Sequence, residues 1–155
     1  MKGLEAVLEK VSLFEDLEPS YLELLAGCAS NVRFEAGESI YAHGDGADRF
    51  WVIRHGRVAL EIYVPQRGAV TVQTLKEGDL LGWSWLVPPY QHTLDARAQL
   101  MTRAVAFDAK CLRGKCEEDP HLGYLMMQKF AQLMVRTLKA TRLQLMDVYG
   151  RPGRD

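Results

Sequence analysis

The stretch Arg49-Phe50-Trp51-Val52-Ile53-Arg54-His55-Gly56-Arg57-Val58-Ala59-Leu60-Glu61-Ile62-Tyr63 decides the fold. Two runs rich in β-branched and aromatic residues stand on either side of His55-Gly56, and this pattern predicts a β-hairpin with a glycine turn. Similar runs fill residues 31–107 and are separated by glycines at 37, 44, 46, 56, 68, 78 and 82. A second reversal is expected at Pro65-Gln66-Arg67-Gly68. No helical crossover separates the runs, so we expect an antiparallel β-roll of the jelly-roll (double-stranded β-helix) type.

Helical patterns flank the predicted strands on both sides. Apolar residues recur at helical spacing before residue 30, and Pro19-Ser20 suits the start of a second short helix. After Phe107 the helical pattern returns, and it is strongest from about His121 to Tyr149. We therefore expect one domain over residues 1–155. Its parts are a helical lead-in at 2–30, the β-roll at 31–107, C-terminal helices at 108–149 and a tail at 150–155.

The long C-terminal helix carries an apolar seam. The seam residues alternate steps of four and three, and they are Met127, Ala131, Met134, Leu138, Thr141, Leu145 and Val148. This spacing is typical of a helix that pairs with another helix, so it predicts a homodimer. Phe130, Leu133 and Thr137 lie beside the seam and are expected to pack on the β-roll. The alternative is that the whole stripe belongs to the intramolecular core.

Composition excludes several classes of partner and of cofactor site. Nineteen basic and twenty acidic residues give a formal charge of −1, so no overall field attracts nucleic acid or an anionic membrane. No apolar run approaches the roughly 20 residues of a membrane span, and we expect a cytoplasmic protein. Cys28, Cys111 and Cys116 show neither a CxxC pair nor a zinc spacing. We expect all three to be buried or reduced thiols.

Short motifs along the chain carry a family resemblance. They are Leu13-Phe14, Gly37-Glu38-Ser39-Ile40, Gly44, Ala47-Asp48, Trp51-Val52-Ile53, Gly56-Arg57-Val58, Gly78-Asp79 and Gly82. In this order they resemble the cyclic-nucleotide-binding domain of catabolite-activator proteins and of protein-kinase-A regulatory subunits. The resemblance extends from about Leu13 to Tyr149. It implies a regulatory, non-enzymatic domain whose ligand is a cyclic nucleotide and whose long helix forms a dimer.

The family holds its ligand in a phosphate-binding cassette, which corresponds here to residues 82–98. In the family, a small helix N-terminus and an arginine hold the cyclic phosphate, and a glutamate takes the ribose hydroxyl. Gly82 matches the family glycine, but Trp83 stands in the place of the glutamate and His92 in the place of the arginine. Arg97 lies an odd number of residues from His92 and is expected to point away from the pocket. We therefore expect weak or no binding of cAMP and cGMP.

Other residues of the cassette are candidates for ligand contacts. Trp83, Trp85 and Tyr90 either fill the volume of a nucleotide or form a remodelled pocket that stacks on a flatter or less charged ligand. On the long helix, Thr141 matches a position from which some family members touch the base. The candidate ligand-binding residues are Gly82, Trp83, Ser84, Trp85, His92, Thr93 and Thr141.

Three classes of function follow from these observations. A ligand-sensing domain with a remodelled pocket is expected, and the alternative is a protein–protein interaction or adaptor module with a filled pocket. A cupin-like metal enzyme is a remote alternative, because His43, His55, His92 and His121 lack the spacing of a metal site. No phosphate loop, nucleophile elbow or His-Glu-x-x-His element occurs, so no enzyme is expected. Only six residues follow Tyr149, and direct DNA binding through a helix-turn-helix is not expected.

Overall fold

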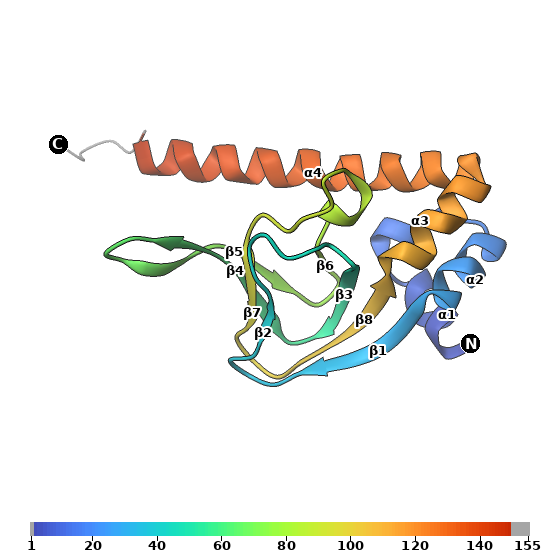
Figure 1. The fold of residues 1–155 in the computed structure, drawn as a ribbon, viewed down its shortest axis with the longest axis horizontal. Coiled ribbons are helices and arrows are strands. Elements are labelled where there is room, and N and C mark those ends of the chain that lie inside the picture. Colours follow the sequence, from blue (N-terminus) through green and yellow to red (C-terminus); the bar gives the residue numbers. More distant parts are fainter. Residues whose placement is uncertain (1, 150–155) are drawn as a thin grey trace.

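The computed structural model describes residues 2–149, and the expected tail at 150–155 lies outside the described residues. Short helices precede a set of strands, and two further helices follow them (Figure 1). The elements are α1 (Lys2–Glu9), the 3₁₀ turn η1 (Ser12–Phe14), α2 (Pro19–Gly27), β1 (Ala29–Phe34), β2 (Ser39–Tyr41), β3 (Arg49–His55), β4 (Arg57–Val64), β5 (Gly68–Lys76), β6 (Leu80–Leu81), the 3₁₀ turn η2 (Ser84–Leu86), β7 (Asp95–Ala98), β8 (Thr102–Asp108), α3 (Ala109–Glu118) and α4 (Pro120–Tyr149). The predicted fold class, a β-roll with short leading helices and a long C-terminal helix, is confirmed.

The strands form two antiparallel sheets. The first sheet has the order β1-β8-β3-β6, and the second sheet has the order β2-β7-β4-β5. In the first sheet, β8 pairs with β1 through Val32 and Ala104 and with β3 through Val52 and Val105. Non-consecutive strands are therefore neighbours in both sheets, as in a roll whose chain passes repeatedly from one sheet to the other.

The predicted hairpin over residues 49–63 is wrong. β3 pairs with β8 and β6, whereas β4 pairs with β5 and β7, so the two strands belong to different sheets. Gly56, at φ +114°, turns the chain from the first sheet to the second, and a Cβ there would lie 2.5 Å from Oγ1 of Thr102. The glycine therefore marks a close approach of two chain segments, and not a two-residue turn. The second predicted reversal is confirmed, because β4 and β5 pair directly across Pro65–Gly68.

Alternation along β3 divides the apolar side chains between two cores. Phe50 and Val52 face the helices, where they join a large core that includes residues of α1, α2, α3 and α4. Trp51 and Ile53 face the interior of the roll, where side chains of both sheets meet. The period of two in a strand explains this division, since successive side chains point to opposite faces.

α4 covers the roll with one part of its length and extends past it with another (Figure 1). Leu122, Met126 and Phe130 are fully buried. Phe130 and the half-buried Leu133 pack on the core as expected, and Thr137 is half-buried beside them. From Leu138 to Tyr149 every residue of the helix is exposed. No helix in the described part of the chain combines the length and the apolar character that a membrane crossing needs.

The expectation that all three cysteines are thiols is wrong for two of them. Cys28 and Cys111 form a disulfide, although they are 83 positions apart in the sequence, and their Cα atoms lie 5.9 Å apart. The pairing of β1 with β8 explains this proximity: Ala29 lies opposite Phe107, so Cys28 reaches the first turn of α3. Cys116 is a free thiol, and burial raises its pKa.

We predict that replacing Cys28 or Cys111 with serine lowers the free energy of unfolding by about 2–5 kcal/mol, because the cross-link restricts a long loop of the unfolded chain. Urea denaturation without reductant measures this change, and Cys116→Ser is the matched control. Addition of reductant to the unmodified protein should reproduce the loss. Equal stability of Cys28→Ser and Cys116→Ser would contradict the prediction.

Candidate functional site

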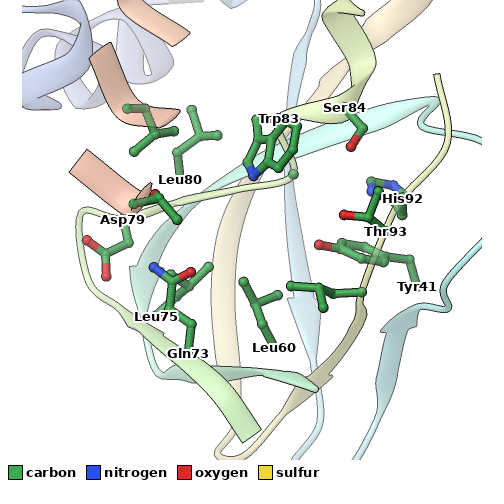
Figure 2. A pocket seen from close by; sticks show the side chains of 14 residues that line it. Tyr41, Leu60, Gln73, Leu75, Asp79, Leu80, Trp83, Ser84, His92 and Thr93 are labelled. Atoms are coloured by element: carbon green, nitrogen blue, oxygen red, sulfur yellow. The ribbon is translucent and has the colours of Figure 1, made fainter. Parts of the chain in front are cut away.

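A cavity of about 100 Å³ lies inside the roll, under α4 (Figure 2). Strands of the second sheet supply its floor, the segment around η2 supplies one wall, and α4 closes it. The lining residues are Tyr41, Leu60, Gln73, Leu75, Asp79, Leu80, Gly82, Trp83, Ser84, His92, Thr93, Leu94, Leu133 and Thr137. The cavity thus lies where the cassette of residues 82–98 meets the long helix.

Gly82 lets the first residues of the cassette lie against the ring of His92, which belongs to the same segment. The φ angle of Gly82, +87°, lies in the left-handed region, where the backbone of a residue with a side chain is strained. A Cβ at this position would also lie 3.3 Å from Cε1 of His92 and 3.6 Å from Cζ3 of Trp51. A glycine is therefore needed for both the backbone conformation and the space.

His92 and Tyr41 form a stacked pair at one side of the cavity. Their ring centroids lie 3.6 Å apart and the rings are nearly parallel, at 9°. Only 4% of the surface of His92 is exposed, and desolvation by burial lowers the pKa of its imidazole, although the charges of Asp45 and Asp48 act in the opposite direction. At neutral pH the imidazole is therefore uncharged, because its pKa lies below the ordinary value of about 6.5.

The charge of the cavity lining comes from one carboxylate. Among the described residues that line it, Asp79 is the only one with a charged side chain at neutral pH. Its carboxylate accepts a hydrogen bond of 2.9 Å from the backbone N–H of Lys76, so the carboxylate is fixed at the rim. Desolvation also raises the pKa of Tyr41, which keeps its hydroxyl protonated. The site therefore offers hydroxyl groups, an amide and one carboxylate, but no cation.

The structure brings five of the predicted residues together around this cavity. Gly82, Trp83, Ser84, His92 and Thr93 all line it. The indole of Trp83 lies over the cavity, opposite the Tyr41 and His92 pair (Figure 2), and 36% of its surface is exposed. It does not fill the interior as a buried ring would. Whether these residues bind a ligand stays a prediction.

Two predicted residues lie elsewhere. Trp85 is fully buried in the helix-side core, where its ring stacks on Phe50, so it does not line the cavity. Thr141 is exposed and donates a hydrogen bond of 2.9 Å to the carbonyl of Thr137. Thr137, one helical turn earlier, is the threonine that lines the cavity. Trp85 and Thr141 therefore do not line this cavity, and a ligand contact by either residue stays a prediction.

Tyr90 and Arg97 also lie outside the cavity lining. Arg113 on α3 donates a hydrogen bond to the Trp85 carbonyl, and its guanidinium lies 4.5 Å from the Tyr90 ring centroid. These contacts fix the cassette to α3. The expectation that Arg97 points away is confirmed, because it pairs with Glu61 at 3.3 Å on an exposed surface.

Sequence reasoning missed several residues of the site. Leu60 on β4 and Gln73 and Leu75 on β5 point into the roll, and the period of two along these strands was the signal that would have placed them. Asp79 follows the turn glycine Gly78, and it was quoted only as a part of the family motif. Tyr41 gave no local signal, because the fold alone brings β2 against His92.

Two antiparallel sheets, a cavity beside η2 and a long helix over that cavity make up the β-roll domain of this chain. The model of the cyclic nucleotide-binding domain family matches residues 31–119. The chain belongs to this family.

Several known proteins are similar to the chain. A CRP-like cAMP-activated global transcriptional regulator of Mycobacterium tuberculosis is 23% identical over 145 residues, which cover 94% of this chain and 63% of the regulator. The chain thus spans less than two thirds of that relative.

Solved structures share the fold. A cyclic nucleotide-binding domain from Methylobacillus flagellatus has a TM-score of 0.78 at 17% identity and covers 94% of this chain and 82% of its own. The regulatory domain of Toxoplasma gondii PKA, solved with cAMP, has a TM-score of 0.71 at 15% identity. The match covers 89% of this chain and 49% of the Toxoplasma chain.

We predict that Gly82→Ala destabilises the domain more than Gly78→Ala. Both glycines have φ near +90°, at +87° and +89°, so alanine costs about 1–2 kcal/mol of backbone strain at each. Only at Gly82 does the new Cβ also press on the stacked His92 ring, whereas nothing lies within 4 Å at Gly78. Urea denaturation of the two variants measures the difference. An equal loss at both positions would show that His92 moves aside without cost.

Proposed function

We propose that the chain is a non-enzymatic, ligand-sensing regulatory domain whose cavity binds cAMP and cGMP weakly or not at all. The observation that carries this proposal is the charge of the cavity lining, in which a carboxylate at Asp79 is present and a cation is absent among the described residues. A cyclic phosphate would lie next to a neutral imidazole instead of a guanidinium. The residues present therefore do not fit a cyclic phosphate.

The magnitude of the missing contacts supports weak binding. Each lost charge-assisted contact costs roughly 1.5–3 kcal/mol, and a desolvated phosphate without a partner adds to that cost. Two such contacts are missing, at Trp83 and at His92. Together they weaken binding by about two to four orders of magnitude, at about 1.4 kcal/mol per tenfold. A flat ligand that is neutral or cationic suits the Trp83 ring and the Asp79 carboxylate better.

Calorimetry with cAMP and cGMP tests the proposal on the unmodified protein. We expect millimolar affinity or no measurable heat for both nucleotides. The double variant Trp83→Glu with His92→Arg restores the two family contacts and should bind at least about tenfold tighter than the unmodified protein. A low-micromolar dissociation constant for the unmodified protein would refute the proposal.

A second candidate function is an adaptor module that binds no small molecule. The observation that favours it is the size of the cavity, because about 100 Å³ is smaller than the roughly 300–1,000 Å³ of ordinary ligand sites. Leu80 of β6 and Leu133 of α4 both contribute apolar side chains to the lining of this small cavity. A thermal shift on addition of neutral or cationic metabolites separates the two candidates, since only a sensor is stabilised by a ligand.

We also propose that the chain forms a homodimer through α4. The predicted seam is the face of the helix that points away from the core, and Met127, Leu138 and Leu145 are 51%, 51% and 52% exposed. The opposite face, with Met126 and Phe130, is fully buried, so the intramolecular core does not use the seam. Apolar side chains repeated along an exposed helix indicate an interaction surface, and the four-three spacing fits a second copy of the same helix.

The variant Leu138→Glu should dissociate this dimer, because it would bury a charge at the centre of the seam. Sedimentation velocity measures the change. Lys139→Glu is the matched control on the next residue of α4, which lies off the seam, and it should remain dimeric. A monomer in the unmodified protein at tens of micromolar, an order-of-magnitude choice for ordinary dimers, would contradict the proposal.

A further inference from the structure

The outer face of the first sheet carries a groove that neither the cavity nor the seam uses. It has a volume of about 340 Å³ and lies across β1, β8 and β3. The lining residues are Asn31, Val32, Arg33, Arg54, Arg103 and Ala104. We call this feature the arginine groove. Three of its six lining residues are arginines, in a chain whose formal charge is −1.

Strand alternation places the three guanidinium groups on one open face. On β8, Arg103 lies two residues from Val105, and on β3, Arg54 lies two residues from Val52. Val52 and Val105 are buried in the core under the helices. Arg54 and Arg103 therefore lie on the same face of the sheet, but at exposed positions that the helices do not cover. β1, which carries Arg33, is the edge strand of this sheet. The groove is therefore open to a partner.

The positive charge in the groove is only partly compensated. Arg33 pairs with Glu35 at 2.8 Å, and Arg54 donates a hydrogen bond of 3.3 Å to the neutral side chain of Asn31. The Arg103 side chain has no hydrogen bond or ion pair with any described residue. It also lies directly across the strand pair from Arg33. Like charges in such a pair destabilise a sheet, so the folded domain carries this cluster at a cost.

We propose that the arginine groove docks an acidic segment of a partner protein. Guanidinium groups bind carboxylates through paired N–H groups, and a segment with alternating acidic side chains would place successive carboxylates along one side. Duplex nucleic acid suits the groove less well. Useful affinity for a duplex needs more phosphate contacts than three arginines supply. Glu35 beside Arg33 would also repel an extended polyanion.

Fluorescence anisotropy with a labelled peptide of alternating Glu and Ser tests the proposal at low ionic strength. We expect the unmodified protein to bind this peptide and the double variant Arg54→Gln with Arg103→Gln to bind it about tenfold more weakly. The double variant Arg67→Gln with Lys110→Gln removes two exposed cations outside the groove, so it is matched in charge and should leave the affinity within about twofold. Far-ultraviolet circular dichroism checks that all variants are folded.

Three outcomes would overturn the proposal. The first is that the unmodified protein does not bind the peptide. The second is that the double variant binds it as tightly as the unmodified protein. The third is that a duplex DNA probe binds more tightly than the peptide and loses affinity in the same double variant. That result would assign the groove to nucleic acid.

Discussion

The packing of four aromatic rings holds the site together. The ring of Phe50 lies 4.5 Å from that of Phe107 and 4.7 Å from that of Trp85, both nearly parallel. Phe130 meets Phe50 and Trp85 edge-on, at 5.4 Å and 5.3 Å. These rings come from β3, β8, the cassette and α4, so one cluster fixes all four elements. Large apolar rings supply much of the burial in a core, and loss of one leaves a cavity that the others cannot fill.

This cluster explains why two tryptophans of the cassette have different roles. Trp85 is buried and anchors η2 to the core, and the chain around η2 then presents Trp83 to the cavity with about a third of its surface exposed. With Phe130 fixed in the cluster, the next turns of α4 bring Leu133 and Thr137 over the cavity. The shape of the site is therefore set by the aromatic core, whereas its charge is set by Asp79 and by the neutral His92.

The sequence predicted features that depend on local periodicity and missed those that depend on long-range approach. The runs of β-branched and aromatic residues between residues 31 and 107 predicted the fold class, and the four-three spacing of α4 predicted the seam, because each pattern lies within single elements. Gly56 was misread as a hairpin turn, since a glycine at a sheet-to-sheet corner has the same local signature. The Cys28–Cys111 pairing depends on the register of β1 with β8, and no spacing reveals it. Trp85 was grouped with the other aromatic residues of the cassette, whereas its ring belongs to the helix-side core.

α4 is the element through which the proposed functions of the cavity and the seam would be coupled. Leu133 and Thr137 face the cavity, whereas Met134 and Leu138, the residues next to them, belong to the seam. Leu133 and Leu138 are five residues apart on the same helix, so a ligand that shifted the backbone of α4 at Leu133 would also shift Leu138. Such a displacement changes dimerisation only when the ligand binds the two positions of α4 with different affinity. The arginine groove lies on the first sheet and contains no residue of α4. A partner bound in the groove would therefore not compete with a ligand in the cavity or with a second copy of the chain on the seam.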